Sequence, residues 1–363
     1  MKFNLRNLVS LVGGFFFFSE YQNEEVENLL EEFLTNHPGK VSLVSDYDAD
    51  GLSAAVLMES FLTARGRSFS LQTPVRTRNI WDTPQDQWLD SLATSAIVMD
   101  LGCRGDKLFS VPTLFIDHHK SNPPSEGDHL YGGYHRDPVP TSAGLVWELV
   151  QHQVPEKKWL AALGTYGDLG SKAPFSYLQE IKSEHTAKAL GEVVSLVNSA
   201  RRISRPRTEL ALKLLRRHDD PKRLVQARDP ELVELEQLRL RVREETDRAK
   251  QQAPIFSEDV ALVQVESDCQ VHPIIAQIWR TRLPKYYVLV ANLGYEKERV
   301  HFSGRSRGKK QILQKLRSLG CWAEDSGFGQ GHDHAAGGVV GLELWRQILR
   351  ELGFESIEGP KGS

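Results

Sequence analysis

Acidic side chains and histidines follow several apolar segments of this 363-residue sequence, and their types suit a metal site. Asp46, Asp48 and Asp50 alternate in the sequence DYDADG, where Gly51 permits a tight turn into the next helix. A calcium loop needs a bidentate acid about six residues after its glycine. The nearest acid beyond that glycine, Glu59, comes later and within an apolar helix. We therefore favour a site for another divalent cation.

Three further segments place ligands after apolar strands or helices. Asp100 ends a strand, Asp117, His118 and His119 end another, and Asp168 lies in a glycine-rich break after a helix. Imidazole beside carboxylate suits a borderline metal such as manganese. Because successive residues of an extended segment point in opposite directions, we expect one histidine to bind metal and the other to contact substrate or orient the site.

Each of these segments alone could be an ordinary cap or turn, but together they predict one anionic cluster. Buried carboxylates repel one another and would take up protons unless cations joined them. Two divalent ions relieve this repulsion and provide the two-metal arrangement that suits phosphoryl chemistry.

Apolar strands alternate with helices in the first half of the chain, which predicts an α/β fold with a doubly wound, mostly parallel sheet covered on both faces. Ligands of such sheets bind beyond the carboxyl ends of the strands, where the acids and histidines fall. We predict strands at 41–45, 69–75, 96–99 and 113–116, and helices at 20–36, 53–64, 143–152 and 157–163, the last ending at Gly164.

The pattern predicts three parts: a catalytic domain at 1–200, a helical connector at 201–254 and a smaller α/β domain at 255–363. In the last part we expect strands at 260–265, 286–292 and 300–302, helices at 273–282, 309–319 and 342–352, and a Gly/His loop at 327–338. Basic residues of the connector are either solvated or line a cleft for a phosphate backbone. They are Arg201, Arg202, Arg205 and Arg207.

The composition is that of a globular protein, with 40% hydrophobic and 26% charged residues and a net charge of -3. The three cysteines form no CxxC pair, which fits a reducing cytoplasm. An apolar run at residues 8–18 is too short to span a bilayer, and we expect it to be a buried segment rather than a signal peptide. We predict no membrane partner.

The motif series resembles the DHH phosphoesterase superfamily. DYDADG, the strand-end Asp100, the Asp-His-His triplet, TSAG at 141–144 and GTYGD at 164–168 occur in the family's order. SGRS at 303–306 and GQGHDHAAGG at 329–338 are similar to the DHH-associated C-terminal domain.

This resemblance implies roles for individual residues. His119 would contact the scissile phosphate, and Asp46 would lie beside the metal cluster. Asp100 would bridge two Mn²⁺ ions, with Mg²⁺ as the alternative. The implied metal ligands are Asp48, Asp50, Asp100, His118 and Asp168. The implied phosphate- or nucleotide-binding residues are Ser303, Arg305, Ser306, Gly331, His332 and His334.

The DYDADG form resembles the RecJ-like branch, because Val44 stands where other branches carry a metal-binding histidine. This implies a 5′-3′ exonuclease that hydrolyses single-stranded DNA or RNA to 5′-mononucleotides. Gln330 departs from an expected glycine, and no counterpart of the OB-type domain of bacterial RecJ is present, which favours short substrates.

Two alternatives stay open. One is a phosphodiesterase or phosphatase for short oligoribonucleotides, cyclic dinucleotides or 3′-phosphoadenosine 5′-phosphate. The other is an inactive nucleic-acid-binding scaffold, which we favour less because every implied ligand position is filled.

Overall fold

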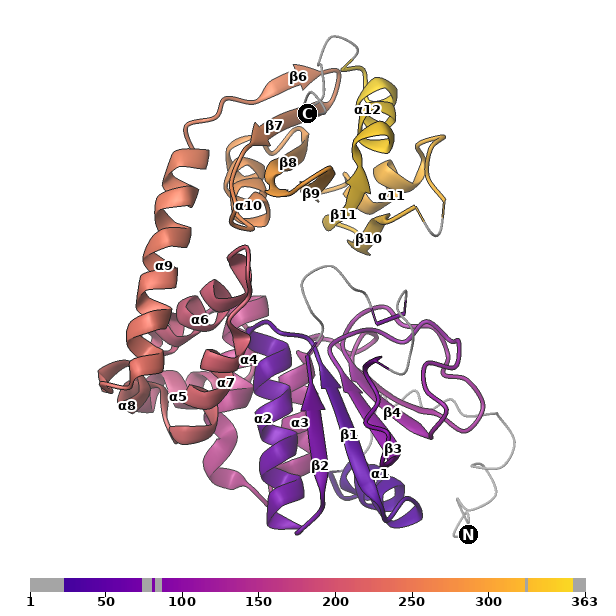
Figure 1. Ribbon diagram of the computed structural model, residues 1–363, viewed down its shortest axis with the longest axis vertical. Helices are drawn as coiled ribbons and strands as arrows, with labels where there is room; N and C mark the ends of the chain where they lie inside the picture. The colour runs from indigo at the N-terminus through magenta and orange to yellow at the C-terminus, as the bar shows by residue number, and fades with distance from the viewer. Residues whose placement is uncertain (1–22, 74–79, 82–86, 324–325, 355–363) are drawn as a thin grey trace. The chain divides into compact units, whose positions relative to one another are not determined.

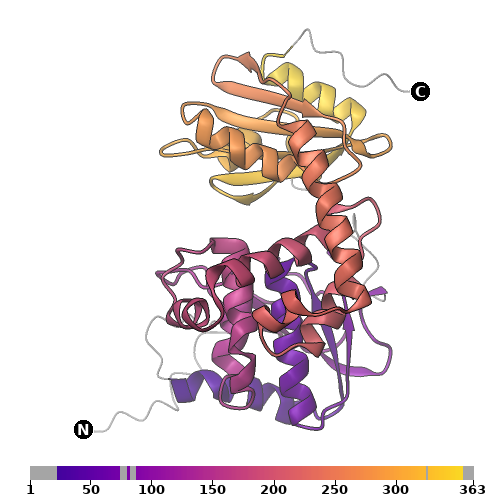
Figure 2. The same cartoon turned by 90° about the vertical axis from the view of Figure 1, so that its left-hand side faces the viewer.

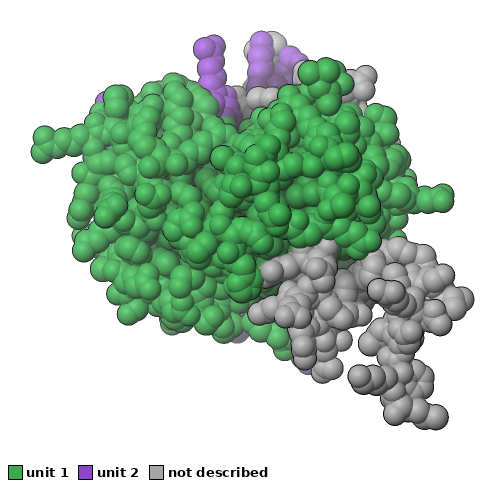
Figure 3. All heavy atoms as spheres, turned by 90° about the horizontal axis from the view of Figure 1, so that it is seen from below, with its two compact units in different colours: residues 1–201, 207–235 green, residues 202–206, 236–363 purple. Residues whose placement is uncertain are grey.

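The computed structural model describes residues 23–73, 80–81, 87–323 and 326–354. The apolar run at 8–18 lies outside these residues. Two compact units make up the chain (Figure 3), Met1–Arg201 with Arg207–Leu235 and Arg202–Pro206 with Glu236–Ser363. The segment that we predict to be a connector is thus divided between the two units. No helix of the described residues combines the length and the apolar composition needed to cross a membrane.

A five-stranded sheet forms the centre of the first unit, and all its strands are parallel, in the order β2-β1-β3-β4-β5. The predicted α/β fold with a parallel sheet is therefore confirmed. The four predicted strands are present, and the short β5, whose segment shows no alternation, was not predicted. The strands are β1 (Lys40–Ser45), β2 (Phe69–Gln72), β3 (Ala93–Met99), β4 (Thr113–Asp117) and β5 (His129–Gly132).

Helices cover one face of this sheet (Figure 1), and others follow its last strand along the chain. They are α1 (Asn23–Asn36), α2 (Ala49–Ala64), α3 (Ser142–Val150), the short 3₁₀ helix η3 (Pro155–Lys157), α4 (Lys158–Leu169), α5 (Ser176–His185), α6 (Ala187–Arg202), α7 (Thr208–Arg217), α8 (Pro221–Gln226) and α9 (Pro230–Ala249). α2 and α3 pack on one face of the sheet. On the other face, Val44, Val98 and Phe115 pack against Trp88 and Phe109, so both faces are covered.

Two helices that carry acidic residues of the site begin or end elsewhere than predicted. α2 begins at Ala49 rather than at residue 53, because the Asp48 side chain caps it and draws the acidic turn into the helix. α4 does not stop at Gly164 but runs to Leu169. Asp168 therefore lies in the last turn of a helix and not in a loop.

The glycines of α4 serve close packing and not a chain break. A Cβ atom at Gly164 would lie 2.4 Å from Oδ1 of Asp50 and 2.6 Å from the Cβ of Ala143, and one at Gly167 would lie 2.8 Å from the Cβ of Ala49. Only glycine lets α4 approach α2 and α3 this closely. These contacts bring together α2, α3 and α4, the helices that carry the acidic residues or bind them.

The second unit contains a six-stranded mixed sheet in the order β10-β11-β9-β8-β7-β6. Its elements are β6 (Ile255–Ser257), β7 (Val260–Val265), α10 (His272–Arg282), β8 (Tyr287–Glu296), β9 (Arg299–Arg305), α11 (Ile312–Arg317), β10 (Phe328–His332), β11 (Ala335–Gly341) and α12 (Leu342–Glu351). α11 and α12 pack on one face, while α10 packs on the other (Figure 2).

The Gly/His segment at 327–338 was predicted to be a loop, and this prediction is wrong, because β10 and β11 form an antiparallel hairpin there. Its glycines permit close strand contacts: a Cβ at Gly337 would lie 2.3 Å from the carbonyl oxygen of Phe302. Gly331 has a φ of +121°, which side-chain-bearing residues rarely adopt. The glycines that suggested a loop are those that this hairpin needs.

We expect Gly164→Ala to destabilise the first unit. Alanine favours a helix by about 1 kcal/mol over glycine, but forcing a methyl group into this contact costs about 1–3 kcal/mol. Chemical denaturation should therefore show a net loss in the free energy of unfolding. Gly132→Ala is the matched control, because its new Cβ would meet no atom closer than 3.7 Å. A more stable Gly164→Ala protein would contradict the packing argument.

Candidate metal centre

The acidic turn after β1 is fixed by its own backbone. The Asp46 carboxylate accepts a hydrogen bond of 2.8 Å from the amide of Tyr47. Oδ1 of Asp48 accepts from the amides of Asp50 and Gly51 at 2.9 and 3.2 Å, as the cap of α2. These bonds use one oxygen of Asp48 and leave Oδ2 for another partner.

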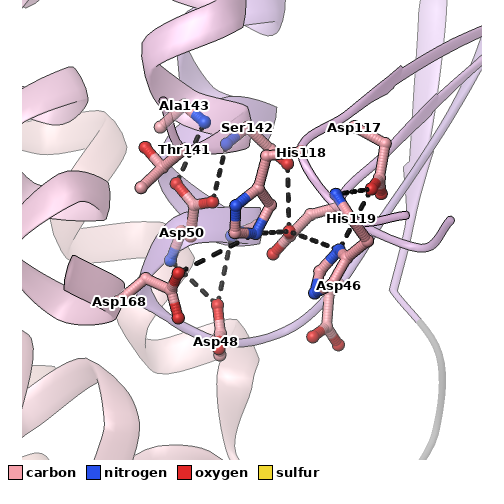
Figure 4. A network of polar contacts seen from close by, with 12 residues as sticks. Asp46, Asp48, Asp50, Asp117, His118, His119, Thr141, Ser142, Ala143 and Asp168 are labelled. Carbon is pink, nitrogen blue, oxygen red and sulfur yellow. Dashed lines mark hydrogen bonds and ion pairs between the residues drawn. The ribbon is translucent and has the colours of Figure 1, made fainter. Parts of the chain in front are cut away.

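Asp50 connects α2 to the beginning of α3 (Figure 4). Its two carboxylate oxygens accept from the amides of Ser142 and Ala143 at 2.8 and 2.9 Å, and its side chain is buried. The positive end of the α3 dipole stabilises this negative charge. Sequence analysis predicted the helix start at Thr141 but missed its contact with Asp50, although a helix N-terminus is a typical partner of a carboxylate.

Asp100 occupies a central position in the site. It follows β3 with a φ of +62°, an uncommon conformation for a residue other than glycine. Its carboxylate is nearly buried, and its Oδ1 accepts a hydrogen bond of 3.0 Å from the hydroxyl of Ser142. Strained backbone of this kind persists where the surrounding structure holds it, often at functional sites.

The two histidines after β4 lie on the same side of the chain, with ring centroids 4.3 Å apart. Nε2 of His118 is 3.5 Å from Oδ1 of Asp100 and 3.8 Å from Oδ2 of Asp168. Nδ1 of His119 is 3.9 Å from the same Asp100 oxygen. The expectation that the rings point in opposite directions is wrong, because the strand ends at Asp117 and its alternation does not continue.

Asp117 orients His119, a role that the sequence did not reveal. Its Oδ1 accepts from the backbone amide of His119 and lies 3.0 Å from Nδ1 of the ring, while Oδ2 accepts from the amide of Gly102 at 2.7 Å. Burial would raise the pKa of Asp117, but His119 holds it below its usual value. Burial would lower the pKa of His119, but the Asp117 hydrogen bond and the charges of Asp117 and Asp100 raise it to about 9.

The other carboxylates of the site disfavour their charged forms. Burial and the charge of Asp48 raise the pKa of Asp46 to about 7. Burial raises the pKa of Asp50 to about 6, and burial together with the charges of Asp50 and Asp48 raises the pKa of Asp100 well above its usual value. Cations at the site would remove this penalty.

The ligand atoms fit two cation positions that share one residue. Atoms of Asp100, His118 and His119 lie within 4.8 Å of one another, and so do atoms of Asp46, Asp48 and Asp100. Asp50 and Asp168, two further predicted ligands, border the same cluster through Ser142 and His118 respectively. Carboxylate oxygens with imidazole nitrogen suit manganese, and the oxygens suit magnesium.

The basic residues of the second unit lie apart from this cluster along the chain. Ser303 and Arg305 point to the α10 face of β9, because their neighbours on β8, Val290 and Val288, pack there. Burial and the charge of Arg280 on α10 lower the pKa of Arg305. Among the described residues, no carboxylate forms an ion pair with Arg305, whose Nη1 donates to the carbonyl of Gly304 at 2.9 Å.

The remaining predicted phosphate-binding residues differ in exposure. The Ser306 hydroxyl is buried, donates to the carbonyl of Lys310 at 2.8 Å, accepts from the amide of Ile312 at 3.1 Å and lies 3.3 Å from Nδ1 of His334. It holds the turn after β9. In the sheet, Ala335 of β11 pairs with His332 of β10 on one side and with Arg305 of β9 on the other. His332 is exposed.

No protein-family model matches the sequence, and no curated protein matches it. Solved structures do resemble it. A RecJ exonuclease bound to manganese is 20% identical with a TM-score of 0.60, over 93% of this chain and 95% of that chain. RecJ from Thermus thermophilus in complex with Mn²⁺ has the same identity and score, but this chain spans only 60% of its length. The DHH domain of a protein described as a member of a ribosomal-protein family is 14% identical, with a TM-score of 0.60 and 93% of each chain covered.

The chain therefore has the fold of RecJ exonucleases and other DHH-domain proteins. This confirms the fold that the motif series predicts. At these identities the likeness extends to the fold alone, so the chemistry has to be argued from the side chains of the site.

The metal-free protein should lose stability as the pH rises from about 4 to about 7. Asp46 and Asp50 have raised pKa values of about 7 and about 6 against a usual 3.8, so over this range the folded chain holds protons that the unfolded chain has released. Unfolding is then favoured as the pH rises. Chemical denaturation in EDTA at a series of pH values measures this, and saturating Mn²⁺ should remove the decline. A flat profile in EDTA would contradict the proposed repulsion.

Asp100→Asn should abolish the stabilisation that Mn²⁺ gives while keeping the fold. Asparagine tolerates positive φ and can still accept from Ser142, but it removes the carboxylate shared by both ligand groups. At a Mn²⁺ concentration one hundred times Kd, we expect the wild type to gain about 2.7 kcal/mol and the variant close to none. Without metal, the variant should be the more stable at pH 8. Asp106→Asn, which changes an exposed acid, is the control.

Proposed function

We propose that the chain is a metal-dependent phosphoesterase, a RecJ-like exonuclease that releases 5′-mononucleotides from the 5′ end of single-stranded DNA or RNA. The observation that carries this proposal is that ligand atoms of Asp100 lie within 4.8 Å of those of His118 on one side and of Asp46 and Asp48 on the other, at the carboxyl ends of the parallel strands. Solved RecJ structures of the same fold contain Mn²⁺ in two cases and Mg²⁺ in a third, which supports a divalent ion here.

The proposed ligands are Asp48, Asp50, Asp100, His118 and Asp168, with Asp46 beside them. Two divalent ions bound there would supply Lewis acidity and an activated water. The chain's own contribution is to hold these side chains in place before substrate arrives. Ser142 positions both Asp100 and Asp50, because its hydroxyl donates to the Asp100 carboxylate and its amide donates to the Asp50 carboxylate.

His119 is the proposed contact to the scissile phosphate. Asp117 fixes Nδ1 of its ring, which leaves Nε2 for the substrate. Burial lowers the pKa of this imidazole, but the Asp117 hydrogen bond and the charge of Asp117 raise it above its usual value and favour the protonated ring. A positive, oriented donor of this kind stabilises the negative charge that develops on phosphate oxygens during hydrolysis.

We further propose that the second unit binds a phosphate of the same substrate. Arg305 has a positive neighbour, Arg280, and no carboxylate ion-pair partner among the residues described. Ser303 shares its face of the sheet, and Gly337 beside it adds no side chain. Small neighbouring residues leave room for a phosphate to approach, and a guanidinium can bind it through two parallel hydrogen bonds.

Asp48→Asn should reduce cleavage at least about 10³-fold, since a lost metal removes several kcal/mol of transition-state stabilisation. Asparagine can still cap α2, so the melting temperature in EDTA should change little. Release of mononucleotides with Mn²⁺ is measured on 5′- and 3′-labelled DNA and RNA strands of graded length, with Asp106→Asn as the control. Near-normal cleavage by Asp48→Asn would overturn the metal assignment.

The same assay decides the substrate class. Dinucleotides, cyclic dinucleotides and 3′-phosphoadenosine 5′-phosphate are included beside the labelled strands. Preferential turnover of those small molecules would replace the exonuclease with a small-substrate phosphodiesterase. Metal binding without turnover of any substrate would favour a nucleic-acid-binding scaffold.

A further inference from the structure

Arg201 lies near the C-terminal end of α6, beside the acidic turn of the first unit. α6 is held against α4 by close contacts: a Cβ at Gly191 would lie 2.8 Å from the hydroxyl of Tyr166, and one at Gly167 would lie 3.7 Å from Val194. Because α4 also packs closely on α2, the three helices form one support. The position of Arg201 is therefore fixed by the same packing that fixes the carboxylates.

The guanidinium of Arg201 is directed at the site. Its Nη2 is 3.6 Å from Oδ2 of Asp48, its carbon lies 5.8 Å from the ring centroid of Tyr47, and its Nε donates to Oδ1 of Asn198 at 3.3 Å. A separation of 3.6 Å exceeds hydrogen-bond length. Arg201 and Asp48 therefore form an ion pair without a direct hydrogen bond between them.

The oxygen of Asp48 that faces Arg201 is the one that remains for a metal ion. Oδ1 already accepts two backbone amides as the cap of α2, whereas Oδ2 faces the guanidinium. An ion bound to Oδ2 would take over the charge compensation that Arg201 provides. The positive charge of the guanidinium would then attract another anion to the edge of the site.

The charge balance of the loaded site favours such an anion. The carboxylates around the cluster number five, Asp46, Asp48, Asp50, Asp100 and Asp168, whereas two divalent ions bring four positive charges. Asp117 is left out because it is paired with His119. Without a further cation the site would keep a negative charge and repel a phosphodiester. Arg201 is the nearby cation that offsets this charge.

We propose that Arg201 is a substrate-binding residue of this site. Its guanidinium, whose Nη2 faces Oδ2 of Asp48, donates to a phosphate oxygen of the nucleotide being cleaved. A planar guanidinium suits a phosphate in two-point contact. This inference rests on the proposed function, because it takes the substrate to be a phosphodiester.

The test separates substrate binding from metal binding. Mn²⁺ affinity is measured by calorimetry without substrate, and the affinity for a short, 5′-phosphorylated strand with phosphorothioate linkages is measured by fluorescence anisotropy. Arg201→Ala should raise the Kd for the strand and the KM about tenfold to hundredfold, with a smaller change in kcat. Its Mn²⁺ affinity should be unchanged or tighter, because a competing cation has gone.

Two further variants control for charge and geometry. Arg201→Lys keeps the charge but lacks the planar fork, so it should recover only part of the binding. Lys188→Ala removes one positive charge from an exposed position on the same helix, more than three turns away, and should bind as the wild type does.

The outcomes are distinguishable. Unchanged strand affinity in Arg201→Ala, or a loss of Mn²⁺ affinity and thermal stability that accounts for weaker binding, overturns the role of Arg201 while leaving the metal site in place. A wild-type protein that neither binds nor cleaves any of these strands overturns the proposed exonuclease itself, and the assignment of Arg201 falls with it.

Discussion

Mutual repulsion among buried carboxylates is the constraint on which the rest of this structure depends. Asp46 and Asp50 come from the acidic turn after β1 and Asp100 from the end of β3, and each has a pKa raised above its usual value, chiefly by burial. A fold that gathers such groups needs compensating charge. The protein itself supplies part of this positive charge. The amides at the start of α3 bind Asp50, and the guanidinium of Arg201 lies near Asp48. Divalent cations are the natural source of the remainder.

Holding this cluster requires helices that approach more closely than ordinary side chains allow. Gly164 and Gly167 let α4 approach α2 and α3, where a Cβ would meet their atoms at less than 3 Å. The same contact sets Asp168 near His118 and holds α3 where its amides reach Asp50. The same glycine contacts therefore determine both the packing of the core and the geometry of the site. Substitutions at these glycines should change both.

The sequence predicts the parts of this arrangement that depend on local pattern. Apolar runs located four strands of the first sheet, and the acids at their ends converge because parallel strands end at one edge. It does not predict what depends on contacts between distant segments. The glycines around Asp168 suggested that the helix ends there. Glycine occurs both in turns and where helices pack closely, and the sequence alone does not distinguish the two. The direction of His119 depends on Asp117 and on where β4 ends, which periodicity alone does not specify.

The two units differ in the kind of charge that each gathers. In the first, buried carboxylates have raised pKa values, and cations would offset their mutual repulsion. In the second, Arg305 and Arg280 are positive charges held near each other by β9 and α10, and burial and the charge of Arg280 lower the pKa of Arg305. The proposed phosphate ligand complements both kinds of charge, because its oxygens would complete the ligation of divalent ions in the first unit and would neutralise Arg305 in the second.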